Sequence, residues 1–205
     1  MKIIDCIQGS AEWLQARQGI PTASRWGDIV TPTGKAVSGA ARRKYALELV
    51  GERLTDSSEG HFVSVAMMRG TELEPAARAW YELVSGNAVA QVGFVEAGKG
   101  KLKWGCSPDG LTTTGGIEIK CPGRTAMLDM IESHKPEPGY MQQMQACMWI
   151  CQRATWDFVV FSDEKGMPSA WWTVERDDAL HAAFAEILPE FCAYVAELEA
   201  TIRKG

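Results

Sequence analysis

Two short strands and a glycine turn are encoded by residues 105–122, which read GCSPDGLTTTGGIEIKCP. Successive side chains of a strand point to opposite faces, so Glu118 and Lys120 share one face and the isoleucines between them point into the core. Asp109 lies nine residues before Glu118, and a turn at glycines 115–116 folds the two strands together. The segment therefore predicts two carboxylates within reach of one metal ion, with a lysine beside them.

This trio of side chains suits the hydrolysis of a phosphodiester. Mg²⁺ prefers oxygen ligands and takes one or two carboxylates together with waters and phosphate oxygens. A bound metal ion lowers the pKa of water and offsets transition-state charge, and a neighbouring lysine can orient or help to deprotonate that water. On its own, Asp109 could be an ordinary Pro-Asp-Gly turn residue, and Glu118 with Lys120 an exposed strand face. The trio alone indicates only that metal-assisted cleavage is feasible.

The composition is that of a soluble globular protein. The chain has 205 residues, 46% hydrophobic and 23% charged, and we expect one domain over residues 1–205. No apolar run approaches the ~18 residues of a membrane helix, and the N-terminus lacks the features of a secretion signal. We therefore expect no membrane contact. The six cysteines include no Cys-x-x-Cys pair, which predicts reduced thiols in a cytoplasmic compartment.

A net charge of −5 is unusual for a protein that binds nucleic acid. Basic residues do cluster at 42–44 and at 99–103. The negative average argues against loose electrostatic coating of DNA, and it suits an enzyme that gathers acids around metal ions.

Periodicity and turn residues predict an α/β chain. The expected helices cover residues 10–18, a short piece from 22, 40–54, 62–85, 140–152 and 177–202. The expected strands cover residues 89–97, 102–107, 110–112, 116–120, 155–162 and 170–174. Pro75 is expected in the first turn of a helix that Gly86 ends, and Pro189 is expected to interrupt the last helix. This order favours a central mixed sheet between helices.

The extended motif around the trio resembles a known family. Pro108-Asp109 followed by Glu118-x-Lys120 is similar to the PD-(D/E)xK nuclease superfamily. The flanking words CSPDGL (106–111) and EIKCP (118–122) resemble the lambda-type phage exonucleases, also called YqaJ-like recombinases. The resemblance implies a single-domain, restriction-endonuclease-like fold. It also implies that Asp109, Glu118 and the backbone carbonyl of Ile119 hold the metal.

Further segments extend this resemblance over most of the chain. Residues 13–24, WLQARQGIPTAS, resemble the family motif whose arginine and serine bind the 5′-terminal phosphate, which implies that role for Arg17 and Ser24. A fork of guanidinium donors matches a phosphate. Arg17 could instead be a solvated helix residue, and Ser24 only a helix cap.

Two helical segments complete the implied site. Residues 70–82, GTELEPAARAWYE, resemble the helix that supplies a further metal-binding acid, here Glu74, although Glu74 could merely pair with Arg78. Residues 140–145, YMQQMQ, resemble the helix that carries an active-site glutamine, here Gln143, which could also be structural.

The resemblance places apolar wedge residues, which separate the terminal base pairs, just before the Glu74 helix. Met67 and Met68 occupy this region, although a methionine pair is more often packing material.

The family implies a magnesium-dependent exonuclease with two ions at its active site, for which Mn²⁺ substitutes. It degrades one strand of duplex DNA from the 5′ end, releases mononucleotides and leaves a 3′ overhang for phage or prophage recombination. The expected assembly is a homotrimeric ring, and the expected partner is a single-strand annealing protein, both in the bacterial host cytoplasm. The alternatives are an endonuclease of restriction or repair from the same superfamily, and a DNA-binding scaffold without catalysis. Arg17 and Ser24 favour the end-dependent enzyme.

Overall fold

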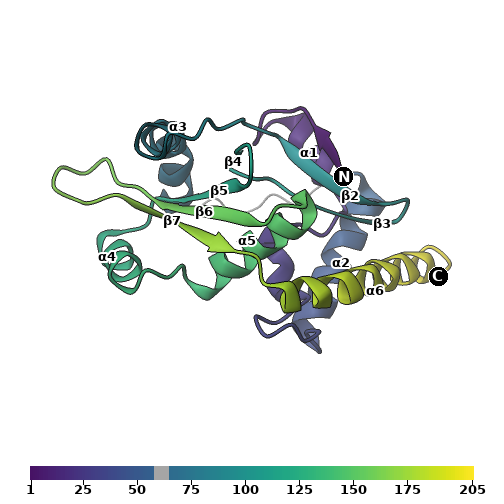
Figure 1. Ribbon diagram of the computed structural model, residues 1–205. Helices are drawn as coiled ribbons and strands as arrows, with labels where there is room; N and C mark the ends of the chain where they lie inside the picture. The colour runs from purple at the N-terminus through teal and green to yellow at the C-terminus, as the bar shows by residue number, and fades with distance from the viewer. Residues whose placement is uncertain (58–64) are drawn as a thin grey trace.

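Strands of the computed structural model form two small sheets with helices around them (Figure 1). The structure describes the backbone of residues 1–57 and 65–205, and the side chains of residues 1–57 and 68–205. In chain order the elements are β1 (Lys2–Ile4), α1 (Ala11–Arg17), the 3-10 helix η1 (Ala23–Asp28), α2 (Ala40–Thr55), α3 (Val65–Ser85), β2 (Phe94–Lys99), β3 (Leu102–Cys106), β4 (Gly110–Leu111), β5 (Gly116–Lys120), α4 (Arg124–Ser133), α5 (Pro138–Cys151), β6 (Thr155–Val160), β7 (Ala170–Glu175) and α6 (Asp178–Ile202).

The larger sheet has the order β4-β5-β6-β7 and mixes both strand directions. β5 runs parallel to β6, with Glu118 opposite Phe158, whereas β4 and β7 are antiparallel to their neighbours. Helices α4 and α5 form the crossover that two parallel strands require. The smaller sheet, β1-β2-β3, is antiparallel. The predicted mixed sheet flanked by helices is therefore confirmed.

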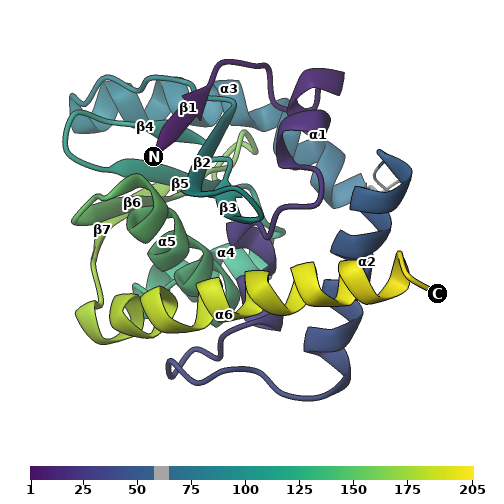
Figure 2. The ribbon, with the colours of Figure 1, turned by 90° about the vertical axis from the view of Figure 1, so that its right-hand side faces the viewer.

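The two faces of β5 and β6 pack against different helices (Figure 2). Ala77 and Tyr81 of α3 pack against Ile117, Ile119 and Val159 on one face. Because side chains alternate along a strand, Glu118 is directed to the opposite face. This is the face that α5 covers, and there Tyr140 stacks on Phe158 with ring centroids 6.0 Å apart. The predicted alternation along β5 thus decides which helix faces the acid.

Gly116 at the start of β5 leaves room for a tryptophan. A Cβ added there would lie 2.4 Å from the ring of Trp156, which is fully buried. The glycine turn before β5 is therefore fixed by packing as well as by turn geometry.

Both proline predictions were wrong. Pro75 lies in the interior of α3, which begins at Val65, and Pro189 lies inside an uninterrupted α6. A proline within a helix removes one hydrogen bond and crowds the preceding turn. Ala77, two residues after Pro75, and Leu188, directly before Pro189, are fully buried, so packing against the core stabilises both helices. Residues 62–64 of the predicted helix 62–85 lie outside the described part of the chain.

Other differences concern elements with a weak pattern. The strand predicted from residue 89 begins at Phe94, and before it only an isolated bridge joins Ala90 to Leu111. Neither β1 nor α4 was predicted from the sequence pattern. Helix α4 buries only Met127 and Met130 among its residues, so its apolar stripe is too narrow to show a clear helical period.

Helix α6 is long and apolar enough by composition to cross a membrane, with a mean hydropathy of 1.2 over 18 residues. Its buried side chains, which include Leu180, Phe184 and Val195, belong to the main core. Packing against the rest of the fold therefore accounts for its apolar character.

Candidate active site

Asp109 is tied to the neighbouring strand by its side chain. Its Oδ2 accepts a hydrogen bond of 2.6 Å from the backbone N–H of Ile119. Gly110, the next residue, pairs with Ile117 across the β4–β5 ladder. The predicted turn thus brings the Asp109 carboxylate to the middle of β5, beside Glu118.

Glu118 is a fully buried carboxylate with an unsatisfied oxygen. Lys120 Nζ lies 2.5 Å from Oε1, whereas Oε2 has no hydrogen-bond partner among the described residues. Burial raises the pKa of Glu118 to about 7, Lys120 opposes this rise and Asp109 adds to it. A buried, partly unsatisfied carboxylate is costly, and a bound cation would remove that cost.

Lys120 is held as a cation. Burial alone favours the neutral amine, but Glu118 and Asp109 outweigh it and raise the pKa of Lys120. Its Nζ also lies 4.9 Å from the centroid of the Tyr140 ring. A lysine in this state donates hydrogen bonds and supplies positive charge beside the two carboxylates.

Glu74 and Arg78 reach this site from α3. Arg78 forms an ion pair with Glu74, and its Nε and Nη2 donate to the backbone oxygen of Asp109 at 3.2 and 3.0 Å. Burial first, and then the charge of Asp109, raise the pKa of Glu74. The Glu74–Arg78 ion pair, which was the alternative to a metal-binding role for Glu74, therefore exists and lies at the candidate site.

Gln143 lies one helical turn from a residue that contacts Lys120. Tyr140, one helical turn earlier on α5, contacts Lys120. Gln142 donates to the carbonyl of Val30, and Gln145 donates to that of Glu175. Gln143 is half-buried, and within the described part of the chain its side chain makes no hydrogen bond. It is thus the one glutamine of the YMQQMQ segment without a described structural hydrogen bond.

The described side chains include no group of three or more His, Cys, Asp and Glu residues arranged to hold a metal ion. The charges of Asp109, Glu118 and Glu74 affect one another, but the three carboxylates are not arranged as joint ligands of one metal ion. Magnesium needs only one or two carboxylates, with waters and phosphate oxygens completing its shell. The buried, unsatisfied Oε2 of Glu118 fits such an ion.

Arg17 lies apart from these acids, at the end of α1. Its guanidinium stacks 4.1 Å above the ring of Trp13, and Nη2 lies 3.4 Å from Thr22 Oγ1. Burial lowers the pKa of Arg17, and it has no ion pair with a described carboxylate. Ser24 lies in η1 with an exposed side chain and does not cap a helix.

A hydrogen bond links the Arg17 region to the acids. Trp13 Nε1 donates to Ser107 Oγ at 2.8 Å, two residues before Asp109. The backbone N–H of Gly105 donates to the carbonyl of Pro21 at 3.0 Å. Residues 13–24 are therefore attached to the strand that leads into Asp109. Sequence reasoning missed Trp13 and Ser107 as linking residues, although both lie inside the motifs it singled out.

Helix α2 holds the turn between Arg17 and Ser24 through hydrogen bonds to Gly19. Glu52 Oε2 accepts a hydrogen bond from the N–H of Gly19 at 2.7 Å, and Arg53 Nε donates to its carbonyl at 2.8 Å. Gly19 has φ +64°, and an added Cβ would lie 2.5 Å from Arg53 Cγ. Only glycine fits this turn without displacement of Arg53.

The predicted wedge is placed in part. Met68 on α3 is 49% exposed, as a residue that meets DNA must be. The side chain of Met67 lies outside the described residues.

Comparison with known proteins identifies the family. The YqaJ-like viral recombinase domain matches residues 12–154, well over half of the chain. The chain belongs to the YqaJ-like viral recombinase family. No curated protein matches it.

Solved structures of exonucleases share the architecture of this chain. The chain is similar to the alkaline exonuclease LHK-Exo from Laribacter hongkongensis, with 37% identity and a TM-score of 0.84 over 95% of this chain and 97% of that one. A complex of LHK-Exo with dAMP gives 38% identity, a TM-score of 0.84 and the same coverage. A phage-related exonuclease from Haemophilus somnus 129PT shares the fold, with 16% identity and a TM-score of 0.67 over 89% and 96% of the two chains. The predicted PD-(D/E)xK fold of this YqaJ-like protein is confirmed.

Proposed function

We propose that this YqaJ-like protein is a magnesium-dependent exonuclease that degrades one strand of duplex DNA from its 5′ end. The observation that carries the nuclease assignment is the buried Glu118 carboxylate, which has one unsatisfied oxygen beside Asp109 and the cationic Lys120. The similarity of the protein to an alkaline exonuclease over nearly the whole chain supports the same reaction class.

The proposed metal ligands are Asp109, Glu118 and the backbone carbonyl of Ile119, with Glu74 at a second ion. Magnesium, which Mn²⁺ can replace, would supply a water of lowered pKa and neutralise charge that develops on the phosphate. Glu74 is paired with Arg78, so it would bind an ion only after it shares or exchanges that partner. Two ions per site are therefore proposed for the DNA-bound state.

Lys120 and Gln143 would orient the reacting groups. Glu118 and the Tyr140 ring hold the Lys120 ammonium in place, where it can donate a hydrogen bond to the attacking water or to a phosphate oxygen. Its raised pKa favours this electrostatic role over that of a general base. Gln143 has an uncommitted amide, which can bind the same phosphate.

Arg17 and Ser24 would recognise the 5′ phosphate. A partly buried guanidinium without a carboxylate partner is a strong anion site, because its charge is neither neutralised nor fully solvated. The Trp13–Ser107 hydrogen bond sets this region relative to Asp109. A fixed separation between the phosphate pocket and the acids would make cleavage count from a 5′ end and release mononucleotides.

The family membership supports a role in phage or prophage recombination within the bacterial cytoplasm. There the protein would act on double-stranded DNA ends and leave a 3′ overhang for a single-strand annealing protein. We include the homotrimeric ring in this proposal, because enclosure of DNA would give processivity to a protein with a net charge of −5. The wedge role of Met67 and Met68 belongs to the same proposal.

Digestion of linear, nicked and closed circular duplexes tests the assignment directly. Each substrate is incubated with Mg²⁺, Mn²⁺ or EDTA, and the linear duplex carries either 5′-phosphate or 5′-hydroxyl ends. We expect metal-dependent release of mononucleotides from linear DNA, faster from phosphorylated ends. Cleavage of closed circles would instead indicate an endonuclease of restriction or repair. Binding of DNA by the protein in the presence of metal, without any cleavage, would indicate a scaffold.

A further inference from the structure

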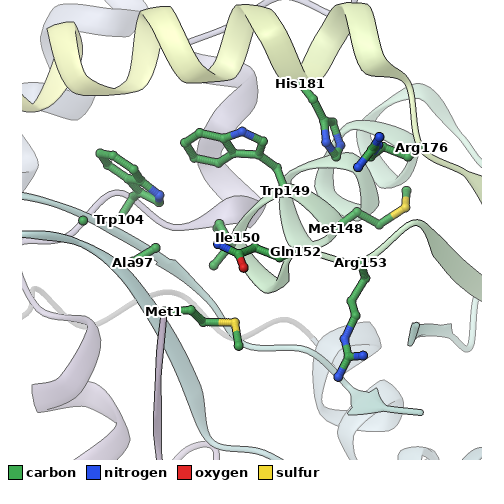
Figure 3. A pocket seen from close by; sticks show the side chains of 11 residues that line it. Met1, Ala97, Trp104, Met148, Trp149, Ile150, Gln152, Arg153, Arg176 and His181 are labelled. Carbon is green, nitrogen blue, oxygen red and sulfur yellow. The ribbon is translucent and has the colours of Figure 1, made fainter. Parts of the chain in front are cut away.

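A cavity lies at the end of the larger sheet away from Lys120. Figure 3 shows the side chains that line it. It has a volume of about 430 Å³ and lies between β2–β3, the C-terminal end of α5 and the start of α6. In the ladder, Lys120 pairs at the Val160 end of β6, whereas the cavity adjoins the Thr155 end. These two ends are roughly 17 Å apart, at about 3.3 Å per residue. The cavity is therefore distinct from the catalytic site.

Two tryptophans form an aromatic wall of this cavity. The rings of Trp104 and Trp149 have centroids 5.3 Å apart and an interplanar angle of 30°. Trp149 is also held edge-on by Trp26 and Phe184. Both wall residues are only partly buried. A fixed indole that keeps part of its surface exposed can stack with a planar ring.

Two arginines give the same cavity a positive charge, and its lining contains no acidic residue. Arg153 donates to the carbonyl of Thr113 and has no carboxylate partner among the described residues. Arg176 pairs with Asp178 at 2.7 Å, but both side chains are well exposed, so solvent weakens this pair. The backbone N–H of Arg176 donates to the carbonyl of Ala154, so the two arginines start from neighbouring backbone positions. Their side chains extend in different directions, with Arg176 beside His181 (Figure 3).

His181 adds a polar group beside the arginines. Figure 3 places its ring next to the Arg176 side chain. Its Nε2 is buried without a hydrogen-bond partner in the described part of the chain. Burial, and then the charge of Arg176, lower the pKa of His181. A neutral imidazole can donate or accept, so it suits the edge of a base as well as a phosphate.

We propose that this cavity binds one nucleotide unit, with its base on the Trp104–Trp149 wall and its phosphate at Arg176 and His181, while Arg153 adds positive charge to the lining. The unit can be a free mononucleotide or part of a single DNA strand, since both present the same base and phosphate. An acidic peptide would satisfy the arginines but would leave the aromatic wall without a planar partner. The inference concerns binding alone, so it does not depend on cleavage by the proposed active site.

Calorimetric titrations in EDTA test the proposal without hydrolysis. The two probes are dAMP and a short oligothymidine with 5′-hydroxyl ends. The key variant is Arg153→Gln/Arg176→Gln, and Lys165→Gln/Lys204→Gln removes the same charge at exposed positions outside the cavity. Lys120→Ala serves as the active-site control. Because Arg153 follows the C-terminus of α5 and can stabilise it, thermal unfolding of each variant is measured in parallel, and Trp149→Phe provides a second disruption that keeps a ring.

We expect the arginine double variant to bind at least one probe about tenfold more weakly, as loss of charge-assisted hydrogen bonds implies. The surface-lysine variant should bind as the wild type does. In Lys120→Ala, the part of the binding that depends on the cavity arginines should remain. Preference for dAMP would identify the free mononucleotide as the ligand, and preference for the oligomer would identify the strand. Absence of binding, or binding that only Lys120→Ala abolishes, would overturn the proposal. If the double variant does not fold, unchanged binding by Trp104→Leu, which removes one ring of the wall, would also overturn it.

Discussion

Trp13 Nε1 donates a 2.8 Å hydrogen bond to Ser107 Oγ, and this bond joins the Arg17 region to the strand that leads into Asp109. The two residues are 94 positions apart in the sequence. Because the Arg17 guanidinium stacks on the same indole, one side chain fixes both the proposed phosphate pocket and its separation from the acids.

Replacement of either partner of this bond should weaken the coupling between the 5′ end and cleavage. Trp13→Phe keeps a ring beneath Arg17 and removes the N–H, and Ser107→Ala removes the acceptor. A hydrogen bond contributes about 1 kcal/mol net, so kcat/KM on 5′-phosphorylated duplex should fall roughly fivefold in each. The double variant should be no worse than the more severe single variant, because both changes remove one interaction. Additive losses would show that the two residues act independently.

Arg17→Ala should slow digestion of 5′-phosphorylated duplexes far more than that of 5′-hydroxyl duplexes. Hydrogen bonds to a charged group contribute about 1.5–3 kcal/mol, which corresponds to roughly a tenfold to hundredfold loss on the phosphorylated end alone. The rates are compared on otherwise identical linear substrates. Arg25→Ala is a matched control, because Arg25 is paired with Asp28 and Glu48 and is not free to bind phosphate. Equal loss on both ends would remove Arg17 from the pocket.

Local patterns predicted the part of the site that is close in sequence. Strand alternation placed Glu118 and Lys120 together, and the glycine turn placed Asp109 beside them. The bonds from Trp13 to Ser107 and from Arg78 to the Asp109 carbonyl join distant segments. Neither hydrogen bond can be predicted from the spacing of residue types, because each depends on how whole helices and strands pack against one another. The same reason explains the errors at Pro75 and Pro189, where tertiary packing outweighs local helix propensity.

Arg78→Lys should loosen α3 from the catalytic strand. A lysine keeps the charge, but it cannot donate from two nitrogens to the Asp109 carbonyl and also bind Glu74 as the arginine does. We expect a loss of roughly 1–3 kcal/mol in the free energy of unfolding, measured with urea. Arg69→Lys on the same helix is the control, because within the described part of the chain the ion pair of Arg69 with Asp163 is exposed. A similar effect of both variants would assign the loss to helix charge.

The proposed ring predicts a definite mass in solution. Light scattering should give about three times 22.5 kDa, independent of protein concentration over the working range. A protein with a net charge of −5 is not held on DNA by overall electrostatic attraction. A trimeric ring would hold it there by enclosing the duplex. A monomer at all concentrations would contradict the ring, and the exonuclease assay would then be expected to show release of DNA after each step.

Lys120→Ala should abolish cleavage and leave duplex binding largely intact. The ammonium lies 2.5 Å from Glu118 Oε1, so its loss removes both a donor near the reacting phosphate and the counter-charge of a buried carboxylate. Because an unpaired buried charge destabilises a fold, thermal unfolding is measured with and without Mg²⁺. Lys120→Met preserves the stem and serves as the packing control, whereas Lys120→Arg preserves the charge. Cleavage should be absent in the alanine and methionine variants, and DNA affinity measured in Ca²⁺ should change less than about threefold, an effect below 1 kcal/mol. Substantial activity in a folded Lys120→Met protein would remove the lysine from the mechanism and leave Asp109 and Glu118 as the groups to test.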